Sequence, residues 1–249
     1  MGSSLHTVRP CRASGMTTFA VGIGGVATGV FTPGSLPGIQ FWYDAGAISG
    51  VTSGTSLSVW TDMSGNERHA SNSLVTEQPL YVNNIINGYP GVRFVPNNDV
   101  LVAPTSGITV DGWTAFCVSV LSTAAGTNDI WVNNRYTMGA ATDSAIVITL
   151  GVKTYTSNVS FFTAGTAVLY TQVFQSGATA NFYKNGSLQS LSTGGGGSQS
   201  ASSLSLGNRA AFPAPWRGDI AEIVAYNRIL TADEKSQVES YMSTKWGTP

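Results

Sequence analysis

Short apolar runs recur along most of this chain, and turn-forming residues such as Gly, Asn, Pro and Ser separate them. Many short apolar runs bounded by turn formers predict an all-β sandwich. The chain has 249 residues, which is enough for one large undivided sandwich with a single core. We therefore predict antiparallel strands over residues 39–43, 57–60, 92–94, 113–121, 145–150, 168–174, 181–183 and 219–226.

The last of these segments is expected at the centre of a sheet. Its alternate residues are largely apolar on both faces, and strict alternation places Glu222 on the same face as Ile220 and Val224. Asn185-Gly186 follows an earlier segment and predicts a tight hairpin turn, because both residues tolerate positive φ. Gly194–Gly197 with Ser198–Ser203 predicts a flexible loop.

One helix is expected, close to the end of the chain. Thr231 is a good N-cap, and Glu234 completes a capping box with it. Val238, Tyr241 and Met242 follow at helical spacing, and Gly247 stands where a helix stop belongs. We expect this apolar stripe to pack on the sandwich as core.

Residues 1–37 form a leader rich in Gly, Ser, Thr and Val, ending in a Pro/Gly cluster that indicates a boundary with residues 38–249. Phe19, Val21 and Ile23 alternate like one face of a strand. Two interpretations stay open: a floppy tail, or an arm that pairs with a neighbouring molecule. The leader resembles a signal peptide only weakly, because glycines interrupt its apolar stretch and no clear cleavage site follows, so we expect it to be retained.

Charge is scarce in this protein. Charged residues make up 10% of the chain and the net charge is −1, whereas an average soluble domain has roughly 25% charged residues. No basic run is present to neutralise phosphates, so a nucleic-acid partner is not expected. No stretch is long and apolar enough to span a bilayer. Such a neutral surface is typical of extracellular, glycan-facing or virion proteins.

The order of motifs in residues 39–247 resembles the concanavalin A-like lectin/glucanase superfamily, specifically the laminin G-like modules of phage and bacterial surface proteins. The resemblance implies an antiparallel jelly-roll sandwich with one C-terminal helix, and it implies no particular function, since the fold hosts lectins, hydrolases and structural modules. The segments that carry it are Phe41-Trp42-Tyr43-Asp44-Ala45, Trp60-Thr61-Asp62-Met63-Ser64-Gly65-Asn66, Asn87-Gly88-Tyr89-Pro90-Gly91-Val92-Arg93-Phe94, Phe182-Tyr183-Lys184-Asn185-Gly186, Leu206-Gly207-Asn208, Gly218-Asp219-Ile220-Ala221-Glu222-Ile223 and Tyr226-Asn227-Arg228-Ile229-Leu230.

Several polar residues of these motifs are expected to serve the scaffold. The Asp62, Ser64 and Asn66 side chains can bond their own backbone and hold an irregular turn. Charged groups on largely buried strands need partners. We expect Arg93 to pair with Glu222, and Arg228 to pair with Asp44 or Asp219.

Catalysis is not expected. Glycoside hydrolysis needs two carboxylates about 5–10 Å apart, and the hydrolase branch of the superfamily carries them on one strand. None of the 13 acidic residues stands two positions from another, so no strand presents two acids on one face. The two histidines, His6 and His69, stand alone, and neither a zinc site nor a Ser-His-Asp triad is indicated.

Carbohydrate binding stays open as a function, because sugar sites combine aromatic platforms with amide and charged groups. Two clusters have that composition, and each is alternatively a hydrophobic plug beneath a loop. A calcium site is a weaker candidate, because calcium takes oxygen ligands but the usual loop motif is absent. The glycan candidates are Trp131, Asn133, Asn134, Arg135 and Tyr136 in the first cluster and Phe212, Trp216 and Arg217 in the second; the calcium candidates are Asn97, Asn98, Asp99 and Asp129.

The sequence thus favours a non-catalytic structural or adhesion protein without a cofactor. The leading hypothesis is an oligomeric virion component of a tailed phage, at the virion surface as capsid decoration, head fibre or tail protein. Its arm would dock on other virion proteins or on copies of itself by strand addition. The alternative is a carbohydrate-binding module of a secreted or surface bacterial protein, and a glycoside hydrolase ranks third.

Overall fold

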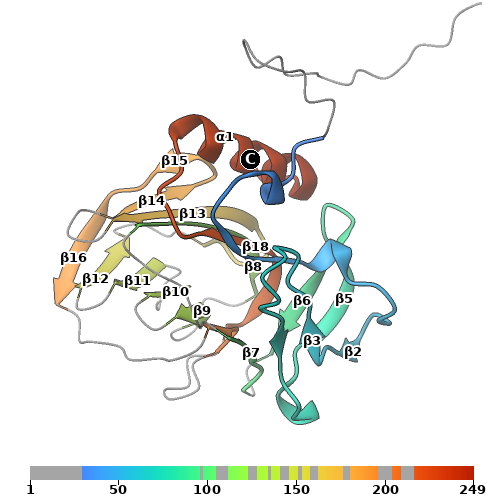
Figure 1. Cartoon of the computed structure of the whole chain (residues 1–249). Coiled ribbons are helices and arrows are strands. Elements are labelled where there is room, and N and C mark those ends of the chain that lie inside the picture. The colour runs from blue at the N-terminus through green and yellow to red at the C-terminus, as the bar shows by residue number, and fades with distance from the viewer. Residues whose placement is uncertain are drawn as a thin grey trace, which may run out of the picture. The chain divides into compact units, whose positions relative to one another are not determined.

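The computed structural model describes residues 30–95, 98–104, 112–122, 128–133, 136–140, 146–150, 153–157, 162–175, 180–195, 204–208 and 216–249. Phe31–Pro249 form one compact unit. In this unit two antiparallel sheets are stacked, and a single described α-helix covers the outer face of one of them (Figure 1). The expected all-β sandwich with one C-terminal helix is confirmed.

Sheet A is the layer that carries the helix. Each of its strands pairs antiparallel with its neighbours, and the longest strands lie at its centre. Its order is β15 (Ser187–Leu188), β14 (Asn181–Lys184), β13 (Ala167–Gln175), β8 (Gly112–Leu121), β18 (Gly218–Tyr226), β6 (Tyr89–Phe94), β5 (Leu80–Ile86) and β2 (Thr55–Ser56), with β1 (Ile39–Asp44) also pairing β18.

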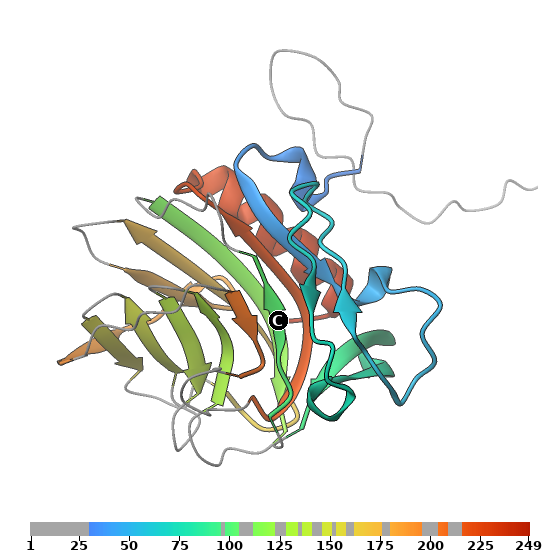
Figure 2. The same ribbon diagram turned by 60° about the horizontal axis from the view of Figure 1, so that its bottom comes forward.

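Sheet B is the opposite layer, and its strands are shorter (Figure 2). Its order is β16 (Leu191–Gly195), β12 (Lys153–Ser157), β11 (Ile146–Leu150), β10 (Tyr136–Ala140), β9 (Asn128–Asn133), β17 (Leu204–Leu206), β7 (Leu101–Ala103), β4 (Ala70–Ser71) and β3 (Val59–Trp60). Three short 3₁₀ helices, η1 (Pro33–Ser35), η2 (Ala45–Ala47) and η3 (Val75–Glu77), connect described elements.

The strands expected from apolar runs all appear, with ends that differ by a few residues. Asn185 and Gly186 have φ of 48° and 75° and join β14 to β15 in the expected tight turn. The loop expected at residues 194–203 begins too early, because Gly194 and Gly195 still pair with β12 as the end of β16. Backbone pairing with a neighbouring strand therefore outweighs the flexibility of these two glycines.

β18 is the central strand that the sequence predicts, and all nine of its residues are buried. Its register with β8 shifts between Ile220 and Glu222. Because of this β-bulge, Ile220 lies opposite Ser119 and Glu222 lies opposite Val118, so the two point to opposite faces. The expectation that Ile220 and Glu222 share a face is therefore wrong. The bulge turns Glu222 outward, toward the helix.

Aromatic residues connect the two layers of the core. Phe41 of β1 contacts Trp113 of β8 at a centroid distance of 5.7 Å, and Tyr43 contacts Trp60 of β3 in sheet B, also at 5.7 Å. Cys117 is a free thiol buried in this core, and burial raises its pKa.

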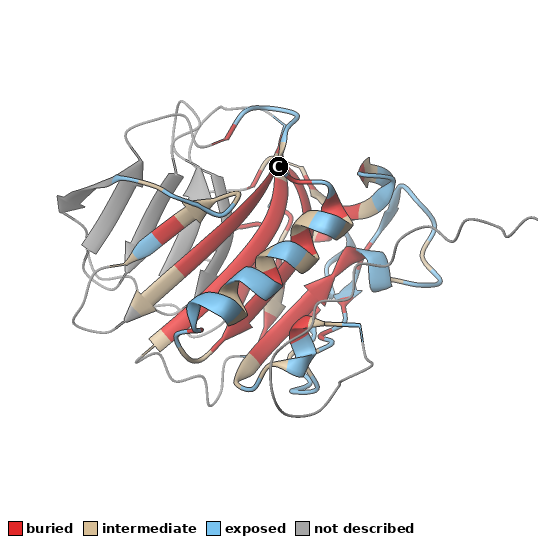
Figure 3. Ribbon diagram, turned by 90° about the horizontal axis from the view of Figure 1, so that it is seen from above, coloured by how far each residue is buried: buried red, intermediate tan, exposed pale blue. Residues whose placement is uncertain are grey.

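The helix α1 (Ala232–Trp246) lies across the buried strands of sheet A (Figure 3). Thr231 accepts a hydrogen bond from the Glu234 amide and Glu234 accepts one from the Thr231 amide, so the expected capping box is present. Gly247 has φ of 65° and ends the helix as expected. Val238, Met242 and Trp246 are buried, whereas Tyr241 is half-buried. Within the described part of the chain, no helix is long and apolar enough to cross a membrane.

The compact unit begins at Phe31, ahead of the boundary expected after residue 37. The ring of Phe31 contacts Tyr241 of α1 edge-on at 6.2 Å. Pro33 is buried, and its carbonyl accepts a hydrogen bond of 2.9 Å from the Tyr226 hydroxyl. The Pro37 carbonyl accepts a hydrogen bond of 2.8 Å from Arg228 Nε. Residues 31–37 are thus built into the sandwich.

Candidate functional site

The first cluster of expected glycan-binding residues falls on the β9–β10 hairpin of sheet B. Trp131 and Asn133 lie in β9, and Tyr136 begins β10. Tyr136 pairs with Asn133, and Met138 pairs with Trp131. Asn134 and Arg135 lie outside the described residues, between the two strands. The hairpin therefore brings the backbones of Trp131, Asn133 and Tyr136 to one end of adjacent strands.

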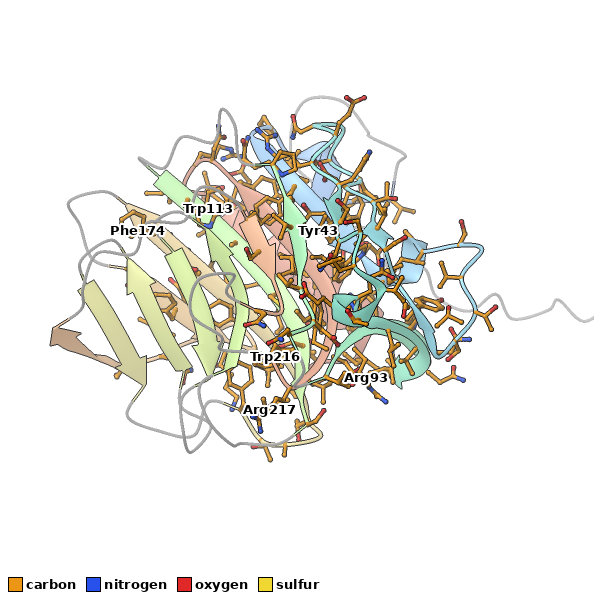
Figure 4. All side chains as sticks on the ribbon, turned by 90° about the horizontal axis from the view of Figure 1, so that it is seen from below. Tyr43, Arg93, Trp113, Phe174, Trp216 and Arg217 are labelled. Carbon is orange, nitrogen blue, oxygen red and sulfur yellow. The ribbon has the colours of Figure 1, made fainter. Side chains whose placement is uncertain are left out.

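The second cluster lies at the entry to β18. Phe212 is outside the described residues. Trp216 is 0% exposed and packs edge-on against Phe162 at 5.5 Å, so its ring belongs to the core and offers no stacking face to solvent. Arg217, which is labelled in Figure 4, is half-buried. The alternative interpretation of this cluster was a hydrophobic plug beneath a loop, and a buried Trp216 agrees with that interpretation.

Other expected site residues are separated. Phe19, Val21 and Ile23 of the arm lie outside the described residues, as does Asn97. Asp99 is buried and accepts a hydrogen bond of 2.8 Å from the Val95 amide, and burial raises its pKa. Asp129 lies in β9 opposite Gly139, and Asn98 has φ of 81°. Among the side chains that the structure describes, no group of three His, Cys, Asp or Glu is placed to hold a metal ion.

An acidic pair that sequence reasoning missed lies beneath α1. Asp44 of β1 and Glu222 of β18 stand directly opposite each other, on the face of sheet A that the helix covers. Lys245 of α1 donates from Nζ to Asp44 Oδ2 at 2.5 Å and to Glu222 Oε2 at 3.0 Å. These two acids lie on different strands, 178 positions apart in the sequence, and only the pairing of β1 with β18 brings them together.

Both oxygens of the Glu222 carboxylate accept hydrogen bonds. Oε1 accepts a hydrogen bond of 2.6 Å from Trp42 Nε1, and Oε2 accepts one of 2.6 Å from Trp246 Nε1. Glu222 is 0% exposed, and burial together with the neighbouring Asp44 raises its pKa, while Lys245 lowers it. These contacts fasten the end of α1 to the sheet. They leave neither oxygen of Glu222 accessible to a substrate.

The ion pairs expected for two arginines differ in the structure. Arg93 forms a bidentate pair with Asp219, with Nε at 2.8 Å from Oδ1 and Nη2 at 3.1 Å from Oδ2. Its expected partner Glu222 points to the helix because of the bulge. Arg228 pairs with Glu234 at 2.7 Å and lowers the pKa of that carboxyl to about 2. The expectations for these pairs were wrong because the partners depend on strand register and on the helix start.

The turn after β3 serves the scaffold, as its sequence predicts. The Asp62 carboxylate is buried and accepts hydrogen bonds from the amides of Trp42, Ser64 and Arg68 at 2.9–3.0 Å. Asn66 Nδ2 donates to the Ile39 carbonyl at 2.9 Å. These contacts tie the turn to β1.

One exposed aromatic ring was also missed. Tyr89 is 42% exposed, and it is the only aromatic side chain of the described residues in the exposed class. It stands beside the Asn87-Gly88 turn, and its ring packs edge-on against Trp246 at 5.4 Å, which fixes its orientation. The sequence assigned this segment to the scaffold, and an exposed Tyr following a tight turn was the available signal.

Solved structures with the same fold include enzymes and binding domains. Trypanosoma rangeli sialidase in complex with the inhibitor DANA matches with a TM-score of 0.58 at 12% identity over 86% of this chain, which spans only 34% of the sialidase. The binding domain of Paraclostridial Mosquitocidal Protein 1 matches with a TM-score of 0.60 at 14% identity, over 88% of this chain and 56% of that chain.

A third match is domain 4 of AbnA, a GH43 extracellular arabinanase from Geobacillus stearothermophilus, in complex with arabinotriose. It has a TM-score of 0.55 and 14% identity, and covers 81% of this chain and 97% of that domain. No curated protein sequence matches this chain at a significant level. The laminin G-like profile described as concanavalin A-like lectin/glucanases superfamily matches residues 87–234, which is more than half of the chain. With two stacked antiparallel sheets and this match, the chain belongs to the concanavalin A-like lectin/glucanase superfamily.

Proposed function

We propose that this protein is a non-catalytic adhesion module that binds carbohydrate. The observation that carries the proposal is the match to the arabinanase domain, because it covers 97% of a domain whose structure contains arabinotriose. A domain of this size and fold is therefore sufficient to hold an oligosaccharide. The low charge of the chain supports the proposal, since sugars are bound through aromatic rings and neutral hydrogen-bonding groups.

The proposed sugar platform is the β9–β10 hairpin with Trp131, Asn133, Asn134, Arg135 and Tyr136. The pairing of Tyr136 with Asn133 supports it, because it brings an aromatic and an amide residue together at the end of the hairpin. Tyr89 is proposed as a second, separate contact on sheet A, where its exposed ring packs against Trp246 of α1. Neither group contains a carboxylate, the usual main ligand of calcium, so we expect binding to persist after calcium is removed with EDTA.

The absence of catalysis remains part of this proposal. Of the described acids, Asp44 and Glu222 form the pair closest to what hydrolysis of a glycosidic bond needs. Both are bound to Lys245, and the helix covers them. An acid that donates its proton to a leaving sugar must reach that sugar, and Glu222 has no exposed surface.

A glycan array tests the proposal directly. A chain comprising residues 31–249 is expected to bind a defined set of oligosaccharides. Trp131→Ala is expected to weaken binding at the hairpin at least about tenfold, and Tyr89→Ala tests the separate contact on sheet A. Leu188→Ala is the control, because Leu188 is an exposed apolar residue at the far edge of sheet A. A flat array would contradict carbohydrate binding. Turnover of any bound glycan that disappears in Glu222→Gln would contradict the non-catalytic assignment.

We further propose that this protein is a virion component of a tailed phage and that several copies dock on the particle through the leader. The alternation of Phe19, Val21 and Ile23 supports docking by strand addition, and repeated copies would raise avidity for host glycans. Removal of residues 1–30 is expected to abolish incorporation into particles while the compact unit, residues 31–249, stays folded. Full incorporation of the shortened chain would contradict the docking role. Recovery of the native protein in the medium, free of particles, would favour a secreted bacterial module.

A further inference from the structure

Arg217 has no partner among the residues that the structure describes. The other described Lys and Arg side chains all have one: Arg93, Arg228, Lys235 and Lys245 pair with carboxylates, and Arg68 and Lys184 have other contacts. Arg217 Nε is buried and lacks an acceptor. Leaving a buried donor of a charged group without an acceptor costs free energy. None of the described residues supplies an acceptor for this guanidinium.

The backbone around Arg217 is held on both sides. The Trp216 amide donates to the Gly207 carbonyl at 2.6 Å, and the Arg217 carbonyl accepts a hydrogen bond of 2.7 Å from the Ser122 amide. The next residue, Gly218, pairs with both β8 and β6. The Trp216 ring is locked in the core beneath. A fixed backbone reduces the entropy that is lost when a ligand binds.

The position of Arg217 leaves part of its side chain accessible. It is half-buried at the end of the sandwich, nearer the margin of the body than Trp216 (Figure 4). A half-buried guanidinium whose Nε has no acceptor among the described residues suits a ligand group that only accepts hydrogen bonds and carries negative charge.

We propose that Arg217 binds the carboxylate of an acidic sugar, such as a uronic acid, and so sets the class of glycan that this protein recognises. The inference rests on the carbohydrate-binding function proposed above. The planar guanidinium offers paired N–H groups that match the two oxygens of a carboxylate, whereas neutral sugars offer no such pair.

Matched ligands and matched variants test the proposal. We expect residues 31–249 to bind tri-galacturonate about ten- to a hundredfold more tightly than its methyl ester, because the ester removes only the charge and one acceptor. Arg217→Gln is expected to abolish this preference, and Arg217→Lys to reduce it because a lysine cannot form the bidentate contact. The control is Arg93→Gln, since Arg93 is already paired with Asp219; it should keep the preference.

The outcomes separate this inference from the function on which it rests. If the protein binds neutral glycans and shows no preference for the acid, the role of Arg217 is overturned and carbohydrate binding stands. If Arg217→Gln, folded by its melting temperature, keeps the preference, the role is likewise overturned. If a sulfated oligosaccharide binds better than tri-galacturonate, the carboxylate assignment is wrong. Should Arg217→Gln not fold, the salt dependence of wild-type binding decides: affinity for tri-galacturonate unchanged between low and high salt contradicts the inference.

Discussion

Asp44 and Glu222 illustrate how a fold makes neighbours of residues that the sequence separates. Like charges directly opposite on adjacent strands are destabilising, and here both carboxylates are also buried. Lys245 offsets this by bonding both of them. Folding raises the pKa of Glu222 above its unfolded value of about 4.5. Its contribution to the free energy of unfolding is therefore fully present below pH 4.5, and it is lost as the pH rises through the pKa of the folded state.

Replacing Lys245 by Met is expected to lower the free energy of unfolding by about 3–5 kcal/mol at pH 7, because two buried carboxylates then lack their cation. Lys245 lowers the pKa of Glu222, so its loss makes stability fall more steeply as the pH rises. Urea unfolding at pH 4 and pH 7 measures this, with a smaller loss at pH 4. Lys235→Met, which removes an i, i+4 pair on the same helix, should cost about 1 kcal/mol or less. Equal losses at both pH values for Lys245→Met would be inconsistent with this account.

Individual contacts were the least predictable part of this protein. The sequence indicated that Asp62 holds a turn, because an Asp bonds its own nearby backbone and needs no knowledge of the fold. It assigned Arg93 and Arg228 the wrong acids, because those partners depend on which strands pair and on the bulge in β18. Burial of Trp216 depended on Phe162 reaching it from a distant segment. Local chemistry could be inferred, and long-range register could not.

The segment that precedes β1 behaves as part of the sandwich. Its Pro33 carbonyl satisfies the buried hydroxyl of Tyr226, and its Phe31 ring lies against α1. The Pro/Gly cluster predicts a boundary after residue 37, whereas the compact unit begins earlier, at Phe31. It could not indicate that the residues just before it pack on the helix, because that contact requires the helix to be in place.

Two truncations separate the leader from this packed segment. A chain starting at Phe31 is expected to keep the melting temperature of the full chain. A chain starting at Gly38 is expected to melt at least about 4 °C lower, because it orphans the Tyr226 hydroxyl and exposes apolar surface, and about 1 kcal/mol shifts the melting temperature of such a domain by about 2–4 °C. Thermal unfolding followed by circular dichroism measures both. Identical melting temperatures for the two chains would show that residues 31–37 do not contribute to stability.

Strands with strong apolar patterns were the predictable elements. β8, β13 and β18 are long and apolar, and the sequence located all three. The strands β12, with the sequence KTYTS, and β16, with LSTGG, carry no such pattern. They exist because neighbouring strands complete their backbone hydrogen bonds. Composition alone therefore predicted a loop where part of β16 lies.

The fold class could be predicted because many short motifs, each weak alone, occur in the order expected for one fold. Strands, turns and the final helix all pointed to one sandwich, which the family match and the two stacked sheets confirm. Function did not follow in the same way, because the same architecture occurs in a sialidase and in an arabinanase domain. The site must be argued from particular side chains.

The compact unit, residues 31–249, is expected to unfold in one cooperative transition. The core links both sheets through Tyr43 and Trp60, and α1 is fastened to β1 and β18 through Lys245. Tryptophan fluorescence reports on this core, and far-ultraviolet circular dichroism reports on both sheets. For residues 31–249 in urea, the two curves should coincide. Two separate transitions would mean that the layers unfold independently.

The contact of Phe31 with Tyr241 fixes where the compact unit of the chain begins. The leading segment enters the body beside α1, on the outer side of sheet A. The β9–β10 hairpin belongs to the other layer. A tether attached at Phe31 would therefore lie on the helix side of sheet A, while sheet B, which carries the proposed sugar platform, lies on the opposite side of the sandwich. Coupling residues 31–249 to a sensor chip at Phe31 would leave sheet B free to meet a glycan.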